Sequence, residues 1–182
     1  MPASFLLVLA GIFHAKTMRR KPIDRASAHS DHYMPLHGMA VTSNTVKNRM
    51  HRYVNFAKAL FQKGATSNGK TFNVCFAVKK SRVLAIGIND YSRVMSGWCK
   101  PLKTVYKKYG EKSYQPSLHA EISAILKLGL EDCSDICFYN VRLDKNCHCR
   151  NSEPCKNCFR ILKMLNAKKM YFYNNDMEIC EI

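Results

Sequence analysis

His119-Ala120-Glu121 and Pro154-Cys155-Lys156-Asn157-Cys158 are the two segments that decide how this chain folds. Each lies at a predicted strand-to-helix junction. Residues at i and i+3 share one face of a helix, so the sulfurs of Cys155 and Cys158 can reach one ion. Helix N-termini also carry a partial positive charge, which favours thiolates over thiols. The two segments therefore predict one metal site at the point where two helices begin.

The ligand types indicate what such a site does. His119, Cys155 and Cys158 are ligands that suit Zn²⁺, and three protein ligands leave the fourth tetrahedral position open, as catalytic zinc sites do. Glu121 stays unligated and is expected to move protons to and from a water activated by the metal. Zinc-dependent nucleobase deaminases combine these parts. A lone C-x-x-C also occurs in structural zinc sites, but the two half-motifs together favour a catalytic one.

The hydrophobic pattern along the chain predicts an α/β domain. Helical periodicity starts at Thr45, and strand-like runs joined by a short turn predict a β-hairpin. The expected elements are a helix over 45–61, strands over 72–78 and 82–88, a helix over 118–130, a strand over 135–143, a helix over 155–166, a strand over 169–173 and a strand fragment over 178–180. Alternating strands and helices need crossovers, so part of the sheet is expected to be parallel. The fold class is a three-layer α/β/α domain with one mixed sheet.

A long polar segment, expected to be a loop over 89–117, leads into His119. Lysines and an arginine alternate in it with tyrosines and a tryptophan. Basic and aromatic side chains together suit phosphate contact and base stacking. The same composition also suits a solvated insertion whose aromatic residues pack on the domain.

The two motifs resemble the cytidine deaminase superfamily in its CMP/dCMP-type branch. The resemblance covers about residues 45–176 and includes Ser152, which opens the second motif after a strand that ends in Asn140-Val141-Arg142. It implies the cytidine-deaminase-like three-layer fold, a Zn²⁺ cofactor bound by His119, Cys155 and Cys158, and Glu121 as the catalytic proton carrier.

The resemblance also implies that Asn89, in Gly87-Ile88-Asn89, binds the sugar or base of the substrate. A turn-forming role for this asparagine is the alternative, because asparagine suits turns. Relatives are often homo-oligomers, so the resemblance implies one here.

Three functions stay open at this point. The first is hydrolytic deamination of cytosine to uracil in a nucleotide such as CMP or dCMP. The second is the same reaction on a base within RNA or single-stranded DNA. The third is an inactive zinc-bound partner subunit or nucleic-acid-binding module, which the intact Glu121 argues against. The sequence does not rank cytosine against adenine or ribose against deoxyribose.

The overall charge favours polyanionic partners. The chain has 182 residues, with 29 Lys and Arg against 13 Asp and Glu, and its net charge is +16. A domain this basic attracts nucleotides, RNA or DNA, although a high charge also serves solubility alone.

The nine cysteines do not form the pattern of a secreted disulfide framework, because their number is odd and four of them crowd between positions 147 and 158. We therefore expect a reducing, cytoplasmic location. Cys147, His148 and Cys149, helped by Cys133 or Cys137, offer an alternative as a second metal site, but free cysteines in a turn fit the spacing better.

Residues 1–43 are expected to be an extension outside the domain at 44–182, either disordered or a targeting segment. The apolar run over 4–13 has ten residues. A membrane-spanning helix needs about 20, so no stable membrane span is expected. Because no positively charged side chain precedes the run, it is also a poor secretory signal.

Overall fold

The computed structural model describes residues 38–65, 71–94, 117–129 and 132–182. All of them belong to one compact unit, residues 35–182. The description begins inside the extension predicted at residues 1–43, and the position of that domain boundary stays a prediction. Residues 95–116, most of the predicted basic and aromatic loop, lie outside the described residues.

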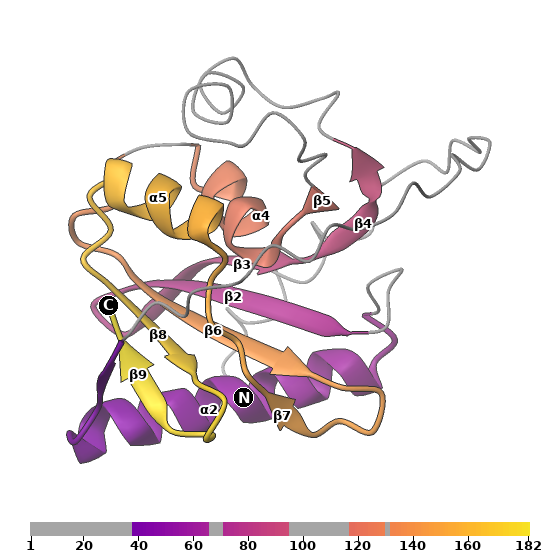
Figure 1. Ribbon diagram of the computed structural model, residues 1–182. Helices are drawn as coiled ribbons and strands as arrows, with labels where there is room; N and C mark the ends of the chain where they lie inside the picture. The colour runs from indigo at the N-terminus through magenta and orange to yellow at the C-terminus, as the bar shows by residue number, and fades with distance from the viewer. Residues whose placement is uncertain (1–37, 66–70, 95–116, 130–131) are drawn as a thin grey trace. The chain divides into compact units, whose positions relative to one another are not determined.

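One mixed sheet forms the centre of this unit (Figure 1). Its strands lie in the order β1 (Met39–Ala40), β9 (Ile179–Glu181), β8 (Lys169–Tyr173), β6 (Cys137–Leu143), β2 (Phe72–Lys79) and β3 (Arg82–Ile88), and β7 (Cys149–Arg150) pairs with β6. The β6–β8 pair is parallel, whereas the other pairs in this sheet are antiparallel. Parallel neighbours need a crossover, and α5 (Lys156–Met164) supplies it. The predicted mixed, partly parallel sheet is confirmed.

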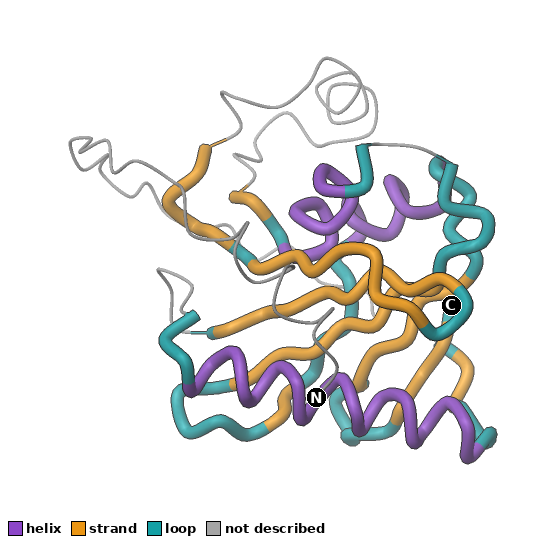
Figure 2. The backbone as a smooth tube through the Cα atoms, turned by 180° about the vertical axis from the view of Figure 1, so that it is seen from behind, coloured by secondary structure: helices purple, strands orange, loops and turns teal. Residues whose placement is uncertain are grey.

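Helices cover both faces of the sheet, which gives the predicted three layers. The helix α2 (Asn44–Gln62) lies on one face, and α5 with α4 (Ala120–Lys127) lies on the other, as the front and back views agree (Figures 1 and 2). The predicted helices therefore exist, and those in the second half are shorter at their ends than the apolar pattern suggested.

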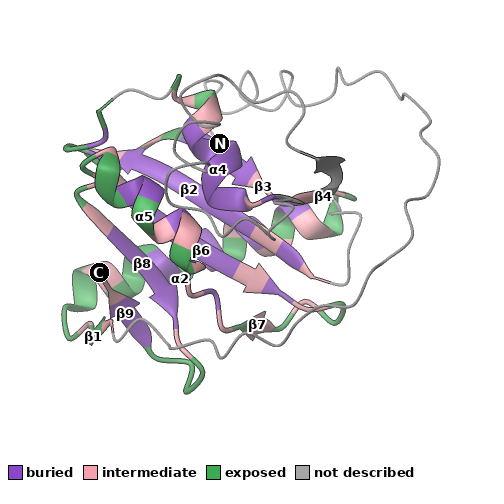
Figure 3. Cartoon of the chain, turned by 45° about the horizontal axis from the view of Figure 1, so that its top comes forward, coloured by how far each residue is buried: buried purple, intermediate pink, exposed green. Residues whose placement is uncertain are grey.

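The two sides of the sheet have separate apolar cores. On the α2 side, the Tyr53 ring lies 5.0 Å from that of Phe76 and 4.6 Å from that of Tyr139, measured between centroids. On the opposite side, Ile122 and Ile161 pack with other buried side chains of α4, α5 and the sheet. The central strands β2, β6 and β8 are mostly buried (Figure 3). Burial on both faces holds the ends of α4 and α5 in fixed positions over the sheet.

The helix α4 lies directly against β3 at Gly87. A Cβ atom at this position would come within 1.9 Å of the Ala120 carbonyl oxygen and 2.4 Å of the Ala124 nitrogen. The Lys127 ammonium also donates a hydrogen bond of 2.6 Å to the Ile86 carbonyl. Glycine is therefore required for the close approach that sets the height of the first turn of α4 above the sheet.

The prediction of a loop throughout 89–117 is wrong at both ends. The strand β4 (Asp90–Val94) pairs antiparallel with β5 (Ser117–Leu118) in a small second sheet. A polar five-residue strand with an irregular register and a two-residue partner carries no alternating apolar signal. Their pairing leads the chain into His119.

The helices in the described part of the chain are all too short or too polar to cross a membrane.

Candidate active site

His119 and Cys155 occupy equivalent places, each immediately before the first turn of a helix. Both have extended backbones, with φ −74° and ψ 155° at His119 and φ −66° and ψ 158° at Cys155. The Cys155 Sγ atom accepts a hydrogen bond of 3.5 Å from the Cys158 backbone N–H. The cap forms because an orphan N–H of a first helical turn needs an acceptor, and the side chain at the N-cap supplies it.

These helix ends bring the three predicted metal ligands together. The His119 Nδ1 atom lies 3.5 Å from the Cys155 Sγ and 3.4 Å from the Cys158 Sγ. Within the described ranges, this is the one group of three potential ligands whose donor atoms all lie within 4.8 Å of one another. A tetrahedral zinc ion holds nitrogen and sulfur ligands about 3.6 Å apart. The spacing and the donor types therefore fit Zn²⁺.

The three donors hold their protons with different strengths. The hydrogen bond from Cys158 lowers the pKa of Cys155 to about 4 against the opposing effect of burial, and His119 adds to the lowering. Burial raises the pKa of the Cys158 thiol well above its usual value. Burial lowers the pKa of His119, but the hydrogen bond and charge of Cys155 outweigh it and raise this pKa to about 8. Cys155 is thus the thiolate of the pair.

Glu121 lies in the first turn of α4, beside the three donors, and is 6% exposed. Its Oε1 atom accepts a hydrogen bond of 3.0 Å from the Asn140 side-chain amide. Burial raises the pKa of Glu121, and the positive charge of His119 opposes this. A carboxyl group with a raised pKa can accept and return a proton closer to neutral pH.

Asn140 is itself fixed by a buried network. Its Nδ2 atom also donates to the Ser152 carbonyl at 3.2 Å, and the Ser152 hydroxyl donates to the Asn140 carbonyl at 2.9 Å. The Tyr173 N–H donates to the same hydroxyl at 2.9 Å. These bonds join β6, β8 and the segment before α5, so the orientation of the Glu121 carboxylate is set by three parts of the chain.

A cavity of about 190 Å³ opens beside these side chains. It is lined by Asn73, His119, Glu121, Asn140, Val141, Arg142, Asn151, Ser152, Glu153 and Cys155. The motif spacing did not single out Asn73, Asn140 and Arg142 as site residues. Asn140 and Arg142 interrupt the otherwise apolar strand β6, which marks them as unusual, but only the fold shows that they line the site.

Asn89 is buried and holds the start of β2. Its Oδ1 atom accepts a hydrogen bond of 2.8 Å from the Asn73 N–H, and its Nδ2 atom donates to the Thr71 carbonyl at 3.3 Å. The cavity lining includes Asn73 and does not include Asn89. A direct contact between Asn89 and a substrate therefore stays a prediction, while its contact with the cavity wall is through Asn73.

The part of the chain that is described holds no second group of three metal ligands around Cys147, His148 and Cys149. Cys133 is buried in the core between α4 and α5. The turn between β6 and β7 is held instead by Asp144, whose carboxylate accepts hydrogen bonds from backbone N–H groups and from the Arg150 guanidinium.

Residues 47–174 match the family model described as the cytidine and deoxycytidylate deaminase zinc-binding region. The chain belongs to this deaminase family. The match spans both ligand segments, so it supports Zn²⁺ as the cofactor of the His119, Cys155 and Cys158 group.

A solved structure with a similar trace is the dCMP deaminase from the cyanophage S-TIM5 in complex with dCMP and dUMP. It is 20% identical to this chain, with 74% of this chain and 85% of that chain covered and a TM-score of 0.41. A likeness of this size carries no conclusion about the substrate. No curated protein matches the sequence.

Proposed function

We propose that this protein catalyses the hydrolytic deamination of cytosine to uracil in a nucleotide, CMP or dCMP. The observation that carries the proposal is the buried carboxylate of Glu121, held by Asn140 next to the His119, Cys155 and Cys158 group. A structural metal site has no use for an unligated carboxylate, whereas a deaminase needs a proton carrier in this place.

The chemistry assigns distinct tasks to these residues. A zinc ion bound by His119, Cys155 and Cys158 would supply Lewis-acid activation of water. Glu121 accepts a proton from the attacking water and delivers it to the ring nitrogen beside the amine-bearing carbon. The water oxygen bonds to that carbon, and Glu121 then takes the second proton from the new hydroxyl group and gives it to the amine. The carbon–nitrogen bond breaks and ammonia leaves. Asn140 keeps the carboxylate directed at the cavity through both transfers.

Asn89 enters the proposal as a candidate substrate contact. Its support is its bond to the Asn73 backbone, because the Asn73 side chain lines the cavity. Asn89→Ala is expected to raise KM more than it lowers kcat if it acts on the substrate side.

The test is a mass-spectrometric deamination screen with the zinc-loaded protein. It offers cytidine, CMP, dCMP, transfer RNA and single-stranded DNA in parallel. We expect CMP or dCMP to be converted, and Glu121→Gln to retain zinc but lose about 10²- to 10⁴-fold in rate. The control is Glu178→Gln, which removes an exposed carboxylate bonded to Asn174 in the β8–β9 turn. No conversion of any substrate by a fully zinc-loaded protein would contradict the proposal and favour an inactive partner subunit.

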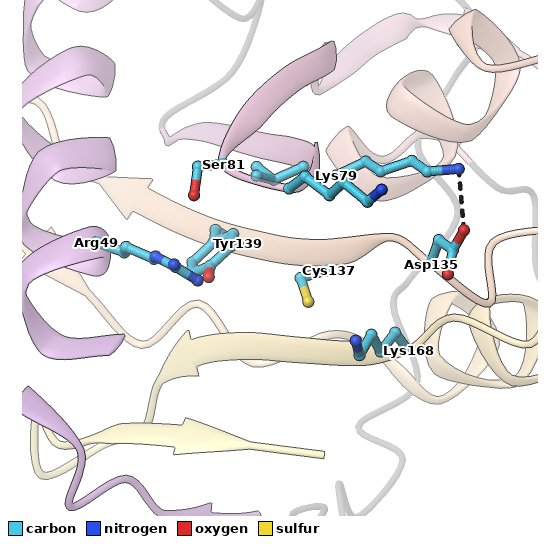
Figure 4. Close-up of a pocket in the computed structure, with 9 residues that line it drawn as sticks. Arg49, Lys79, Ser81, Asp135, Cys137, Tyr139 and Lys168 are labelled. Carbon is cyan, nitrogen blue, oxygen red and sulfur yellow. Dashed lines mark ion pairs between the residues drawn. The ribbon is translucent and has the colours of Figure 1, made fainter. Parts of the chain in front are cut away.

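A second candidate is deamination within RNA or single-stranded DNA, which a basic cavity on the α2 side of the sheet favours. This cavity measures about 220 Å³ and is lined by Arg49, Val78, Lys79, Lys80, Ser81, Asp135, Cys137, Tyr139 and Lys168. Among the lining residues, Asp135 is the acidic one, and it pairs with Lys79 at 3.0 Å. Figure 4 shows Arg49 directed at Tyr139 from α2 and Lys168 on the opposite side.

Salt dependence separates this candidate from the first. A polynucleotide held through several phosphates loses affinity steeply as salt rises, whereas a mononucleotide loses little. For the second candidate, Arg49→Glu with Lys168→Glu is expected to weaken RNA or DNA binding without changing dCMP turnover. Unchanged polynucleotide binding in that double variant would exclude the basic cavity as the docking surface.

A further inference from the structure

We propose that Arg142 forms an anion subsite in the wall of the candidate active-site cavity and binds the phosphate of a mononucleotide substrate. The inference rests on the proposed function, because it names the group of that substrate which lies furthest from the reacting base. It adds to the proposed function a residue that determines preference for a nucleotide over a nucleoside.

The register of the sheet places Arg142 on the same face as Asn140, the hydrogen-bond partner of Glu121. Arg142 follows Asn140 by two positions in β6, and side chains two apart in a strand point to the same face. In the antiparallel pair of β2 and β6, Asn73 lies directly opposite Arg142. Opposite residues share a face, so Asn73, Asn140 and Arg142 form one polar group beneath α4 and α5. All three line the cavity that contains His119 and Glu121.

The Nε–H group of Arg142 has no hydrogen-bond partner among the residues that the structure describes. This group is buried and donates to no acceptor. The neighbouring arginine across the strand pair, Arg150, is in contrast held by the Asp144 carboxylate at 2.7 and 2.9 Å. A buried donor on a charged group is costly to leave unpaired, and an anion that enters the cavity would remove that cost.

Phosphate is the anion that this position fits. Guanidinium groups bind phosphate through two parallel N–H donors. Two residues along β6 separate Arg142 from Asn140 by about 7 Å, and Asn140 binds the Glu121 carboxylate. A nucleotide whose base reaches Glu121 can therefore place its phosphate along the strand at Arg142, in the same cavity.

One other group in the wall agrees with this orientation. The Oδ1 atom of Asn73 is buried without a donor, so an acceptor for a sugar hydroxyl lies opposite Arg142. Glu153 also lines the cavity, with its backbone N–H bonded to Asn151, and it adds negative charge that opposes an anion there. Arg142 is the one arginine or lysine among the residues that line this cavity, so selectivity for phosphate depends on it.

The experiment compares CMP with cytidine in steady-state kinetics. Arg142→Gln is expected to raise KM for CMP at least about tenfold, the loss typical of a charge-assisted hydrogen bond, while KM for cytidine stays within about twofold. Arg142→Lys is expected to have a KM for CMP between those of the wild type and Arg142→Gln. Lysine keeps the positive charge but lacks the two parallel N–H donors of arginine. The control is Arg82→Gln, which removes the same charge at the exposed end of β3.

Calorimetry gives a readout that does not depend on turnover. CMP is titrated into Glu121→Gln and into Glu121→Gln with Arg142→Gln, and the second protein is expected to bind at least about tenfold more weakly. Equal affinity in the two proteins would overturn the subsite, as would an equal loss of CMP and cytidine turnover in Arg142→Gln. Conversion of cytidine alone, or of polynucleotides alone, by the wild type would also overturn it and leave the deaminase reaction standing. If the wild type converts nothing, the proposed function fails, and the calorimetric comparison still decides whether Arg142 binds phosphate.

Discussion

At the residue scale, the three proposed metal ligands make zinc binding dependent on pH. Zinc binding requires deprotonated cysteines and a neutral histidine, so it releases protons. The raised pKa values of Cys158 and His119, the latter about 8, mean that both hold protons at neutral pH before metal binds. The proton on His119 competes with zinc increasingly as pH falls below about 8. We therefore predict that zinc affinity decreases on acidification.

The measurement is a zinc titration against a competing chelator at about pH 6 and about pH 9, with calorimetry in two buffers of different ionisation enthalpy to count released protons. The matched control is Cys147→Ser, which alters a cysteine in the β6–β7 turn and should keep the full pH dependence. Cys158→Ser should lose most of the affinity. An affinity that does not change with pH would contradict the assignment of His119 as a ligand.

The grouping of the three proposed metal ligands could be predicted from the sequence, whereas the residues around them could not. His119, Cys155 and Cys158 belong to short local spacings at helix starts, which a linear pattern displays. Asn140 and Arg142 acquire their roles from the register of β6 against β2 and from the position of α4 above the sheet. The strand register and the position of α4 depend on residues far apart in the sequence, so no local spacing predicts them.

At the element scale, Gly87 is the point where α4 meets the sheet. Gly87→Ala would place a methyl group 1.9 Å from the Ala120 carbonyl oxygen. Because backbone atoms cannot yield as a flexible side chain does, α4 must move away from β3. We predict destabilisation of about 1–3 kcal/mol and weaker zinc binding, because His119 precedes Ala120. Urea unfolding and zinc titration measure both effects. Leu84→Ala, an exposed position on the same strand, is the control; a Gly87→Ala protein with unchanged stability would show that α4 is not confined there.

Asp144 stabilises the turn that leads from β6 into the segment before α5. The His148 N–H, with Arg150 and the Asn146 N–H, lowers the pKa of Asp144 from 3.8 to about 2. A lowered folded-state pKa contributes stability that is present above about pH 4 and is lost as pH falls through about 2. Asp144→Ala should therefore unfold at a lower urea concentration than the wild type at neutral pH. The difference between the two urea midpoints should disappear toward about pH 2. A difference that persists there would refute the electrostatic account.

The elements that could be predicted are those with a strong period. The hairpin of β2 and β3, the helix α2 and the strand β8 each repeat apolar residues over several positions. The two-residue strands β1 and β7, and the short pair of β4 and β5, have no period to detect. Each forms because a partner strand, β9 for β1, β6 for β7 and β5 for β4, offers backbone groups to pair with, which is a property of the assembled fold.

At the scale of the whole molecule, the three-layer order follows from elements whose apolar faces need partners on both sides of the sheet. The predicted alternation of strands and helices in the second half of the chain requires a crossover, and the structure provides it between the parallel strands β6 and β8. The N-terminal boundary of the domain does not follow from this argument, because the sheet itself continues into the predicted extension. Met39 and Ala40 pair with Glu181 and Cys180 at the edge of the sheet.

This edge pairing yields a prediction about truncation. Removing residues 1–37 should leave the unfolding midpoint unchanged, because the paired residues stay in place. Removing residues 1–43 also removes β1 and the hydrogen bond of 2.8 Å from the Val41 N–H to the Ile179 carbonyl. The longer deletion leaves the backbone of β9 unpaired at an edge, and exposed edges lower stability and promote association. Thermal unfolding and light scattering of the two truncated proteins measure these effects, with the full chain as control. Equal unfolding midpoints for both truncations would show that β1 contributes nothing and that the boundary at residue 43 is correct. A loss already seen on removing residues 1–37 would place part of that segment in the folded domain.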